Sequence, residues 1–126
     1  MSVIETSINK DADLTIQTVT GKISAKEISN AIENYFKGVL TKLVLWDFTN
    51  ADLSSIKSIE IQDIVDVTKK YLNLRPVGKT AMVFSSDLGF GMGRMYGTKQ
   101  EITKPDNISY MSFRDKGKAL NWLQEK

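Results

Sequence analysis

The chain has 126 residues, of which 41% are hydrophobic and 25% are charged, and this composition is typical of one globular domain, residues 1–126, with a single hydrophobic core. It contains no cysteine, which excludes disulfide bonds, thiolate metal sites and cysteine nucleophiles. It contains no histidine, which removes the commonest general base and the commonest metal ligand. We therefore expect a non-enzymatic protein with no catalytic residues, no cofactor and no metal site.

The net charge of +2 comes from basic and acidic residues that are interspersed along the chain. Because there is no basic block, the sequence lacks the positive surface that nucleic-acid binding requires. No apolar run approaches the roughly 18 residues that span a membrane, and the first residues do not resemble a signal peptide. These observations predict a cytoplasmic protein that binds no nucleic acid and has no integral membrane segment.

The first half of the chain predicts a hairpin, a helix and a buried strand. Two β-branched runs, 3–8 and 14–19, are separated by polar residues and predict an antiparallel hairpin. A helix is expected over 24–38, because a serine and a glutamate have capping-box spacing at its start. The near-continuous apolar run 42–48 is typical of a strand that is covered on both faces.

The second half repeats this alternation. Apolar residues at helical spacing predict a helix over 58–74. The remaining elements are expected to be a strand, a glycine-rich turn with a following helix, a strand and a closing amphipathic helix, at 79–85, 85–102, 108–113 and 115–124.

The order ββαβαβαβα predicts an α/β fold with a mixed five-stranded sheet and flanking helices. We expect the later strands to be parallel and joined by right-handed crossovers. The exposed edge of the first hairpin makes a homodimer a further expectation. The aromatic residues on apolar stripes are expected in the core; they are Tyr35, Phe36, Trp46, Tyr71 and Trp122.

Residues 85–97, "SSDLGFGMGRMYG", contain four glycines directly after a predicted strand. Their spacing is GxGxG and not the GxGxxG of a dinucleotide site, and too little chain follows for a dinucleotide-binding domain. Two interpretations stay open. The glycines allow a helix to lie close to a strand, or free amides of Gly91 and Gly93 at the helix start, aided by Arg94, bind a carboxylate or phosphate.

A second glycine motif, "NLRPVGKT", ends like a nucleotide-binding P-loop but lacks the first glycine of that motif. It also leads from a helix into a strand, which is the reverse of the order that a P-loop needs. We therefore expect Lys79 to flank the sheet and not to bind a nucleotide.

Oxygen-bearing side chains follow the most buried strand, where ligands gather in open α/β sheets. They are Asp47, Thr49, Asn50, Asp52, Ser54 and Ser55. Such residues also form turns, and a serine before a helix is usually its N-cap, so a structural role is the competing interpretation. Asp47 and Asp52 alone are a weak pair for a metal ion.

The strand "LVLWDF" with serines shortly after it, the segment "RPVGKTAMVFSSDLGFGMGRMYG" and the ending "FRDKGKALNWL" together resemble the SpoIIAA-like family. These small bacterial proteins are related in fold to STAS anti-sigma-factor-antagonist domains and more distantly to CRAL-TRIO lipid-binding domains. The resemblance covers essentially the whole chain and implies a five-stranded mixed sheet and a largely unassigned role. STAS regulators carry a phosphorylatable serine at the start of the second helix. The nearest match here is "ADLSSIK", which points to Ser54 or Ser55, although Leu53 interrupts the motif and the following glycine is missing.

These observations favour a binding or regulatory module that interacts with a partner protein near Ser54, Ser55 and the second helix. The alternative is a binder of a small anionic or lipid-like ligand. That ligand would lie between the loop after Asp47 and the glycine-rich loop, with its anionic end at Arg94. An enzyme is the poorest hypothesis, because no catalytic constellation is recognisable.

Overall fold

The computed structural model describes residues 2–71, 74–75, 77–103 and 107–125. The elements are β1 (Val3–Asn9), β2 (Leu14–Lys22), α1 (Ala25–Lys37), β3 (Leu43–Asp52), α2 (Ser58–Lys70), β4 (Val77–Phe84), α3 (Asp87–Thr103), β5 (Asn107–Phe113) and α4 (Lys116–Gln124). The strands form one five-stranded sheet in the order β1-β2-β3-β4-β5. β1 is antiparallel to β2, and all other neighbours are parallel, so the predicted mixed sheet and element order are confirmed.

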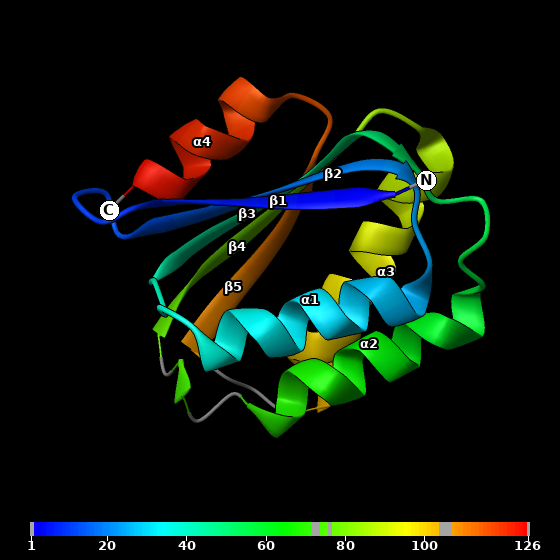
Figure 1. Cartoon of the computed structure of the whole chain (residues 1–126), viewed down its shortest axis with the longest axis horizontal. Coiled ribbons are helices and arrows are strands. Elements are labelled where there is room, and N and C mark those ends of the chain that lie inside the picture. Colours follow the sequence, from blue (N-terminus) through cyan, green and yellow to red (C-terminus); the bar gives the residue numbers. More distant parts are fainter. Residues whose placement is uncertain (1, 72–73, 76, 104–106, 126) are drawn as a thin grey trace.

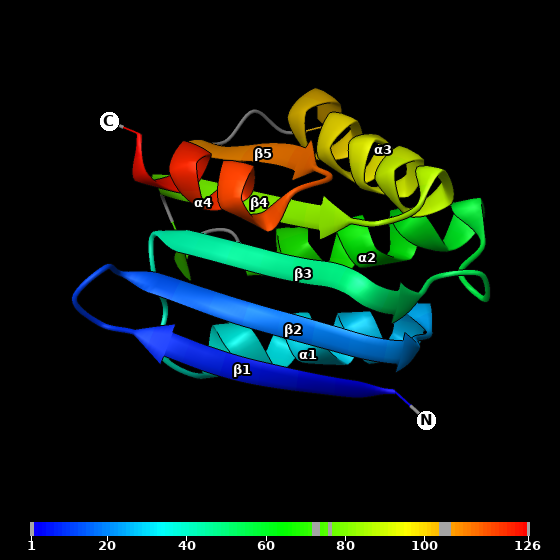
Figure 2. The ribbon, with the colours of Figure 1, turned by 90° about the horizontal axis from the view of Figure 1, so that it is seen from above.

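The helices form two layers around the sheet (Figures 1 and 2). α1, α2 and α3 cover one face, and α4 alone packs on the other, against β3, β4 and β5. Seen from the α4 side in Figure 2, β1 and β2 have no helix over them. The sheet therefore has one fully covered face and one half-covered face.

β3 lies in the centre of the sheet, and its alternate residues supply both cores. Trp46 and Phe48 point into the larger core, where a continuous stack joins them to Phe84 with ring centroids 5.9 and 5.2 Å apart. Leu45 points the other way and packs in the smaller core with Ala119 of α4. The aromatic residues predicted to lie in the core are all buried in, or packed against, one of these two cores, as expected from their apolar stripes.

Two helices differ in extent from the predictions. α2 ends at Lys70 rather than at residue 74, with Tyr71 as its C-cap, and residues 72–73 lie outside the described part. α3 begins at Asp87, so the glycine-rich stretch is helical and not a turn. Its start is fixed by Ser86, whose Oγ accepts from the Gly89 amide (3.0 Å) and whose carbonyl oxygen accepts from the Phe90 amide (3.0 Å).

The last four residues of the segment that resembles a P-loop, 77–80, begin β4, so the segment leads into a strand as predicted. A Cβ on Gly78 would lie 2.1 Å from the carbonyl oxygen of Lys42, so this glycine permits two backbones to approach. Lys79 donates from Nζ to the carbonyl oxygens of Trp122 (2.8 Å) and Glu125 (2.9 Å) at the end of α4. Both residues therefore have structural roles. Among the described residues, every helix is too short or too polar to span a membrane.

Candidate functional site

The glycines of α3 mark the face that packs on the sheet. Gly89, Gly93 and Gly97 are buried and four residues apart, whereas Gly91 is exposed. A Cβ on Gly93 would lie 2.3 Å from the Phe84 ring, but a Cβ on Gly91 would meet nothing within 4 Å. The first interpretation of these glycines, a close approach of helix to strand, is therefore confirmed.

The second interpretation, an anion cradle of glycine amides, is wrong in its mechanism. Only the first four amides of a helix lack an intrahelical partner. Gly91 and Gly93 lie beyond the first four residues of α3, so their amides belong to the helical ladder. The sequence predicted a turn here because glycine is a poor helix former in isolation. In the structure the stretch is helical, and Gly89 and Gly93 pack against Phe84.

A groove runs between α3 and β5 and has a volume of about 330 Å³. We call it the α3–β5 groove; its lining includes Arg94, Thr98 and Glu101 of α3 and Tyr110, Met111 and Ser112 of β5. Arg94 is exposed at its wall, and Met111 is 45% exposed. Within the described part of the chain, the buried Oγ of Ser112 has no hydrogen-bond partner. Of the predicted site residues, Gly93 and Arg94 line this groove.

Asp47 lies on the opposite side of the sheet. Its Oδ1 accepts from the amide (3.0 Å) and hydroxyl (2.5 Å) of Thr49, and its Oδ2 is 3.8 Å from Nζ of Lys116 in α4. α3 covers the other face, so the sheet separates Asp47 from Arg94. Asp47 itself therefore does not line the groove beside Arg94, because strand alternation turns its side chain away from those of its neighbours Trp46 and Phe48.

Ser54 and Ser55 lie in the loop between β3 and α2. Neither caps α2, since that helix begins at Ser58 with Lys57 as its N-cap and Oε1 of Glu60 accepts from the Lys57 amide (2.8 Å). The N-cap expectation for these serines is therefore wrong. Both serines are exposed, and the hydroxyl of Ser55 donates to the carbonyl oxygen of Ile23 (3.2 Å).

Asp52 organises this loop. Its Oδ1 accepts from the Ser54 amide (2.9 Å), and the hydrogen bonds from Ser54 hold the pKa of Asp52 below its usual value. Leu53 of this loop packs against the first turn of α3, since its Cδ1 lies 2.9 Å from the position that a Cβ on Gly89 would occupy. The serine loop and the first turn of α3 are therefore neighbours at the carboxyl edge of the sheet.

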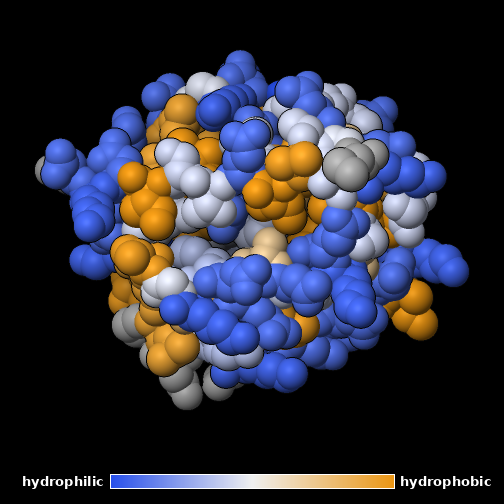
Figure 3. Space-filling model, in the orientation of Figure 1, coloured by the Kyte–Doolittle hydropathy of each residue, from blue (hydrophilic) through white to orange (hydrophobic). Residues whose placement is uncertain are grey.

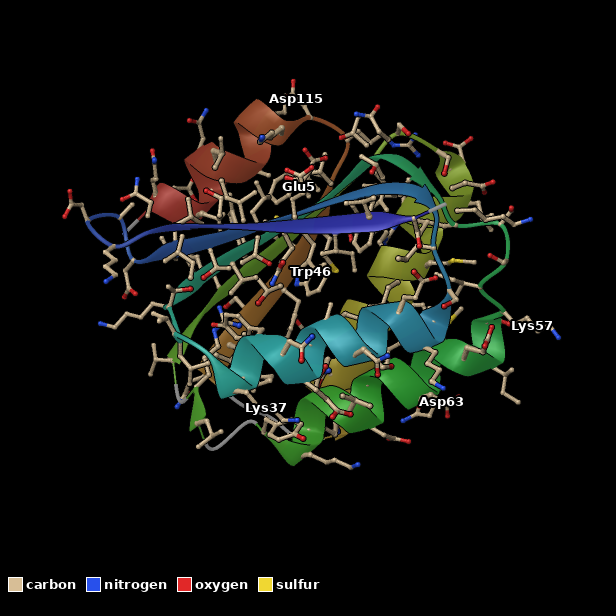
Figure 4. The ribbon with its side chains drawn as sticks, in the orientation of Figure 1. Glu5, Lys37, Trp46, Lys57, Asp63 and Asp115 are labelled. Atoms are coloured by element: carbon tan, nitrogen blue, oxygen red, sulfur yellow. The ribbon has the colours of Figure 1, made fainter. Side chains whose placement is uncertain are left out.

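The structure also contains a cavity between the sheet and helices α1 to α3 that the sequence did not indicate. The residues that line it are almost all apolar. One of them is Trp46, which points from the sheet toward α1 in Figure 4. Its volume is about 70 Å³. Pockets for drug-sized ligands measure about 300–1,000 Å³, so this cavity has no room for a lipid-like molecule. A cavity of this kind results from the packing of distant elements, so no sequence motif predicts it.

An ion pair lies near the groove, and the carboxylates described in this region do not form a metal site. Arg114 pairs with Asp87 at the start of α3 (2.6 Å) and lies over the Phe90 ring, 4.6 Å from its centroid. Among the residues that the structure describes, no three acidic side chains converge as metal ligands.

This architecture is the SpoIIAA-like α/β fold. The structure is similar to that of a DUF3478-family protein with a SpoIIAA-like fold from Shewanella loihica PV-4, with a TM-score of 0.59, 18% identity and coverage of 97% of this chain and 93% of that chain. It is also similar to an anti-sigma factor antagonist from Mycobacterium paratuberculosis, with a TM-score of 0.59, 11% identity and coverage of 99% and 96%. The unphosphorylated anti-sigma factor antagonist SpoIIAA gives a TM-score of 0.50, 11% identity and coverage of 98% and 100%. No protein-family model matches the sequence, and no curated protein does.

Proposed function

We propose that this protein is a regulatory module that binds an extended segment of a partner protein in the α3–β5 groove. The fold supports a partner-binding role, because two of the similar structures are anti-sigma factor antagonists, whose name denotes action on another protein. The observation that carries the proposal is the groove itself, which runs beside an edge strand without a single charged residue. Edge strands without charges are the ones that accept an added strand from another chain.

The charges on the groove wall predict the chemistry of the bound segment. Arg94 and Glu101 both line the groove and are seven residues apart on α3, which is about 10 Å along a helix. An extended chain covers that distance in about three residues. We expect a segment in which an acidic residue, held by Arg94, lies two to four positions from a basic residue, held by Glu101. The residues between them would lie against Tyr110 and Ser112, whose side chains face α3.

Selection from a random peptide library on phage, followed by fluorescence anisotropy of the selected peptides, tests this proposal. We expect peptides in which an acidic and a basic residue flank β-branched residues, and about tenfold weaker binding to Arg94→Glu, because the charge reversal removes an ion pair and adds repulsion. Lys26→Glu is the matched control, since Lys26 is an exposed cation on α1 away from the groove, and it should bind normally. The proposal fails if no peptide is selected, or if both variants bind alike.

Phosphorylation of Ser54 is proposed as the regulatory step. Ser54 is the better acceptor of the two serines, because the hydroxyl of Ser55 already donates to Ile23. A phosphate on Ser54 would place about two negative charges beside the Asp52 carboxylate, which now accepts the Ser54 amide. The resulting repulsion would disturb the loop that Leu53 packs against the first turn of α3.

Mass spectrometry of the protein isolated gently from its own cells tests this step, with Ser54→Ala as the control. We expect a phosphate on Ser54 in the wild type and none in the variant. An unmodified mass would remove the switch and leave the groove proposal intact. The same spectrum tests the second candidate function, a small anionic ligand held by Arg94, which the size and the exposed guanidinium of the groove favour.

A further inference from the structure

The edge strand β1 lacks the features with which soluble proteins prevent strands from pairing. It has seven residues, no proline and no lysine, and its only charge is Glu5. Its pairing with β2 runs without a register shift from Val3 opposite Thr20 to Asn9 opposite Leu14, so no bulge twists the edge away. An edge of this length without bulge, proline or lysine is a template for another strand.

We propose that β1 pairs antiparallel with β1 of a second copy of this chain, about a two-fold axis at Thr6. The two five-stranded sheets then form one continuous sheet. In this register Thr6 faces Thr6 of the second copy, Ile4 faces Ile8, and Glu5 faces Ser7. The proposal concerns the opposite edge of the sheet from the α3–β5 groove and does not depend on the function proposed for that groove.

The strand is self-complementary only in this register. Ile4 and Ile8 lie on the α1 side, and Ile8 is 40% exposed in the single chain, so the α1-side face of the joined sheet gains two equivalent contacts between Ile4 of one copy and Ile8 of the other. Glu5 points to the other side in Figure 4 and would face an uncharged serine. A two-fold axis at Glu5 would place two carboxylates opposite each other, and an axis at Ser7 would pair only five residues.

The surroundings of β1 leave room for a second copy, whereas those of β5 do not. In Figure 2, α3 extends past the edge of β5, so two copies that met there would bring their α3 helices together. α1 stays beneath β1 and β2, and α4 does not reach them. Pairing of β1 with β5 of another copy would also leave free edges and continue without closing, whereas β1 with β1 closes after two chains.

A hollow beneath β1 would be shared by the two copies. It lies between the hairpin and α1, measures about 360 Å³, and is seen from the β1 side in Figure 3. A two-fold axis perpendicular to the sheet keeps both α1 helices on the same face. The hollows of the two chains would then face each other beneath the joined strands, and Ile8 and Val39, which are both exposed and line the hollow, would be partly covered.

A cysteine at the axis tests the register directly, because the chain has no cysteine of its own. Opposed residues of antiparallel strands have Cα atoms about 4.5–5.5 Å apart, within the range of about 4.4–6.8 Å that a disulfide spans. Thr6→Cys should therefore form a disulfide-linked dimer on mild oxidation. Ser7→Cys is the matched control, since it would face Glu5 and should remain largely uncrosslinked. Equal crosslinking of both variants, or none in Thr6→Cys, would overturn the proposal.

Charge substitutions at Ser7 test the energetics by sedimentation equilibrium over micromolar to millimolar concentrations. Ser7→Glu would set two new carboxylates against Glu5 and should weaken the dimer about tenfold, whereas Ser7→Lys should strengthen it. Glu5→Lys combined with Ser7→Glu should restore dimerisation, which a general loss of folding could not do. Circular dichroism checks that each variant is folded. A wild-type chain that stays monomeric throughout, or variants that do not change dissociation, would contradict the proposed interface.

Discussion

Two glycines of α3, two residues apart, have opposite requirements for space. A methyl group on Gly93 would collide with Phe84 and Ser112, so Gly93→Ala should lower the free energy of unfolding by about 1–3 kcal/mol. Gly91 faces solvent with nothing within 4 Å, so Gly91→Ala should raise it by about 0.5–1 kcal/mol through helix propensity. Urea denaturation measures both, and equal effects would refute the packing role. The sequence indicated that small residues were needed here, but it did not distinguish the two positions.

At the scale of one element, the start of α1 couples stability to pH. Oγ of Ser24 accepts from the Glu27 amide (3.1 Å), and hydrogen bonds from Ser2 and Ser24 lower the pKa of Glu27 below its usual 4.5. Ser24→Ala should cost about 1 kcal/mol at neutral pH. Because the pKa of Glu27 is lower in the folded chain, the ionised carboxylate stabilises the fold above pH 4.5. This stabilisation is lost as the pH falls through the pKa of Glu27 in the folded state, so Ser24→Ala should be less destabilising in acid. Urea denaturation at neutral and acidic pH measures it, and a pH-independent cost would contradict the role of Glu27.

At the scale of the whole molecule, Arg75 links segments that are distant in sequence. It is a buried cation in the connection between α2 and β4. It donates to the carbonyl oxygens of Thr41 (3.1 Å), Lys42 (2.7 Å) and Lys79 (2.8 Å) and to the hydroxyl of Thr80 (2.7 Å). These bonds join the connection before β3 to β4 across the sheet. A lysine cannot span these acceptors, so Arg75→Lys should lower the free energy of unfolding by about 3 kcal/mol.

The control for this prediction is Arg94→Lys, because Arg94 is exposed and the change should stay within about 0.5 kcal/mol. Urea denaturation compares the two variants. Similar small effects of both changes would mean that the connection is held by other contacts. Nothing in the sequence distinguishes Arg75 from the exposed arginines, since its importance comes from backbone carbonyls that other segments supply.

The sequence by itself determined the order of strands and helices, the parallel character of β3 to β5 and the capping of α1. These features follow from hydrophobic periodicity and from neighbours a few residues away, which are local properties of the chain. The exposed edge of β1 was also an expectation from the sequence, because a hairpin leaves one edge of its outer strand unpaired unless another strand is added there.

Only the tertiary structure decided where the candidate site residues lie. Asp47 lies in β3 and Arg94 in α3, yet the sheet separates them, because strand alternation turns Asp47 toward α4 and the crossover places α3 on the other face. Gly89 and Gly93 of α3 pack against Phe84, and Leu53 of the serine loop packs against Gly89. Contacts between residues distant in sequence set each of these placements, and no local pattern encodes them.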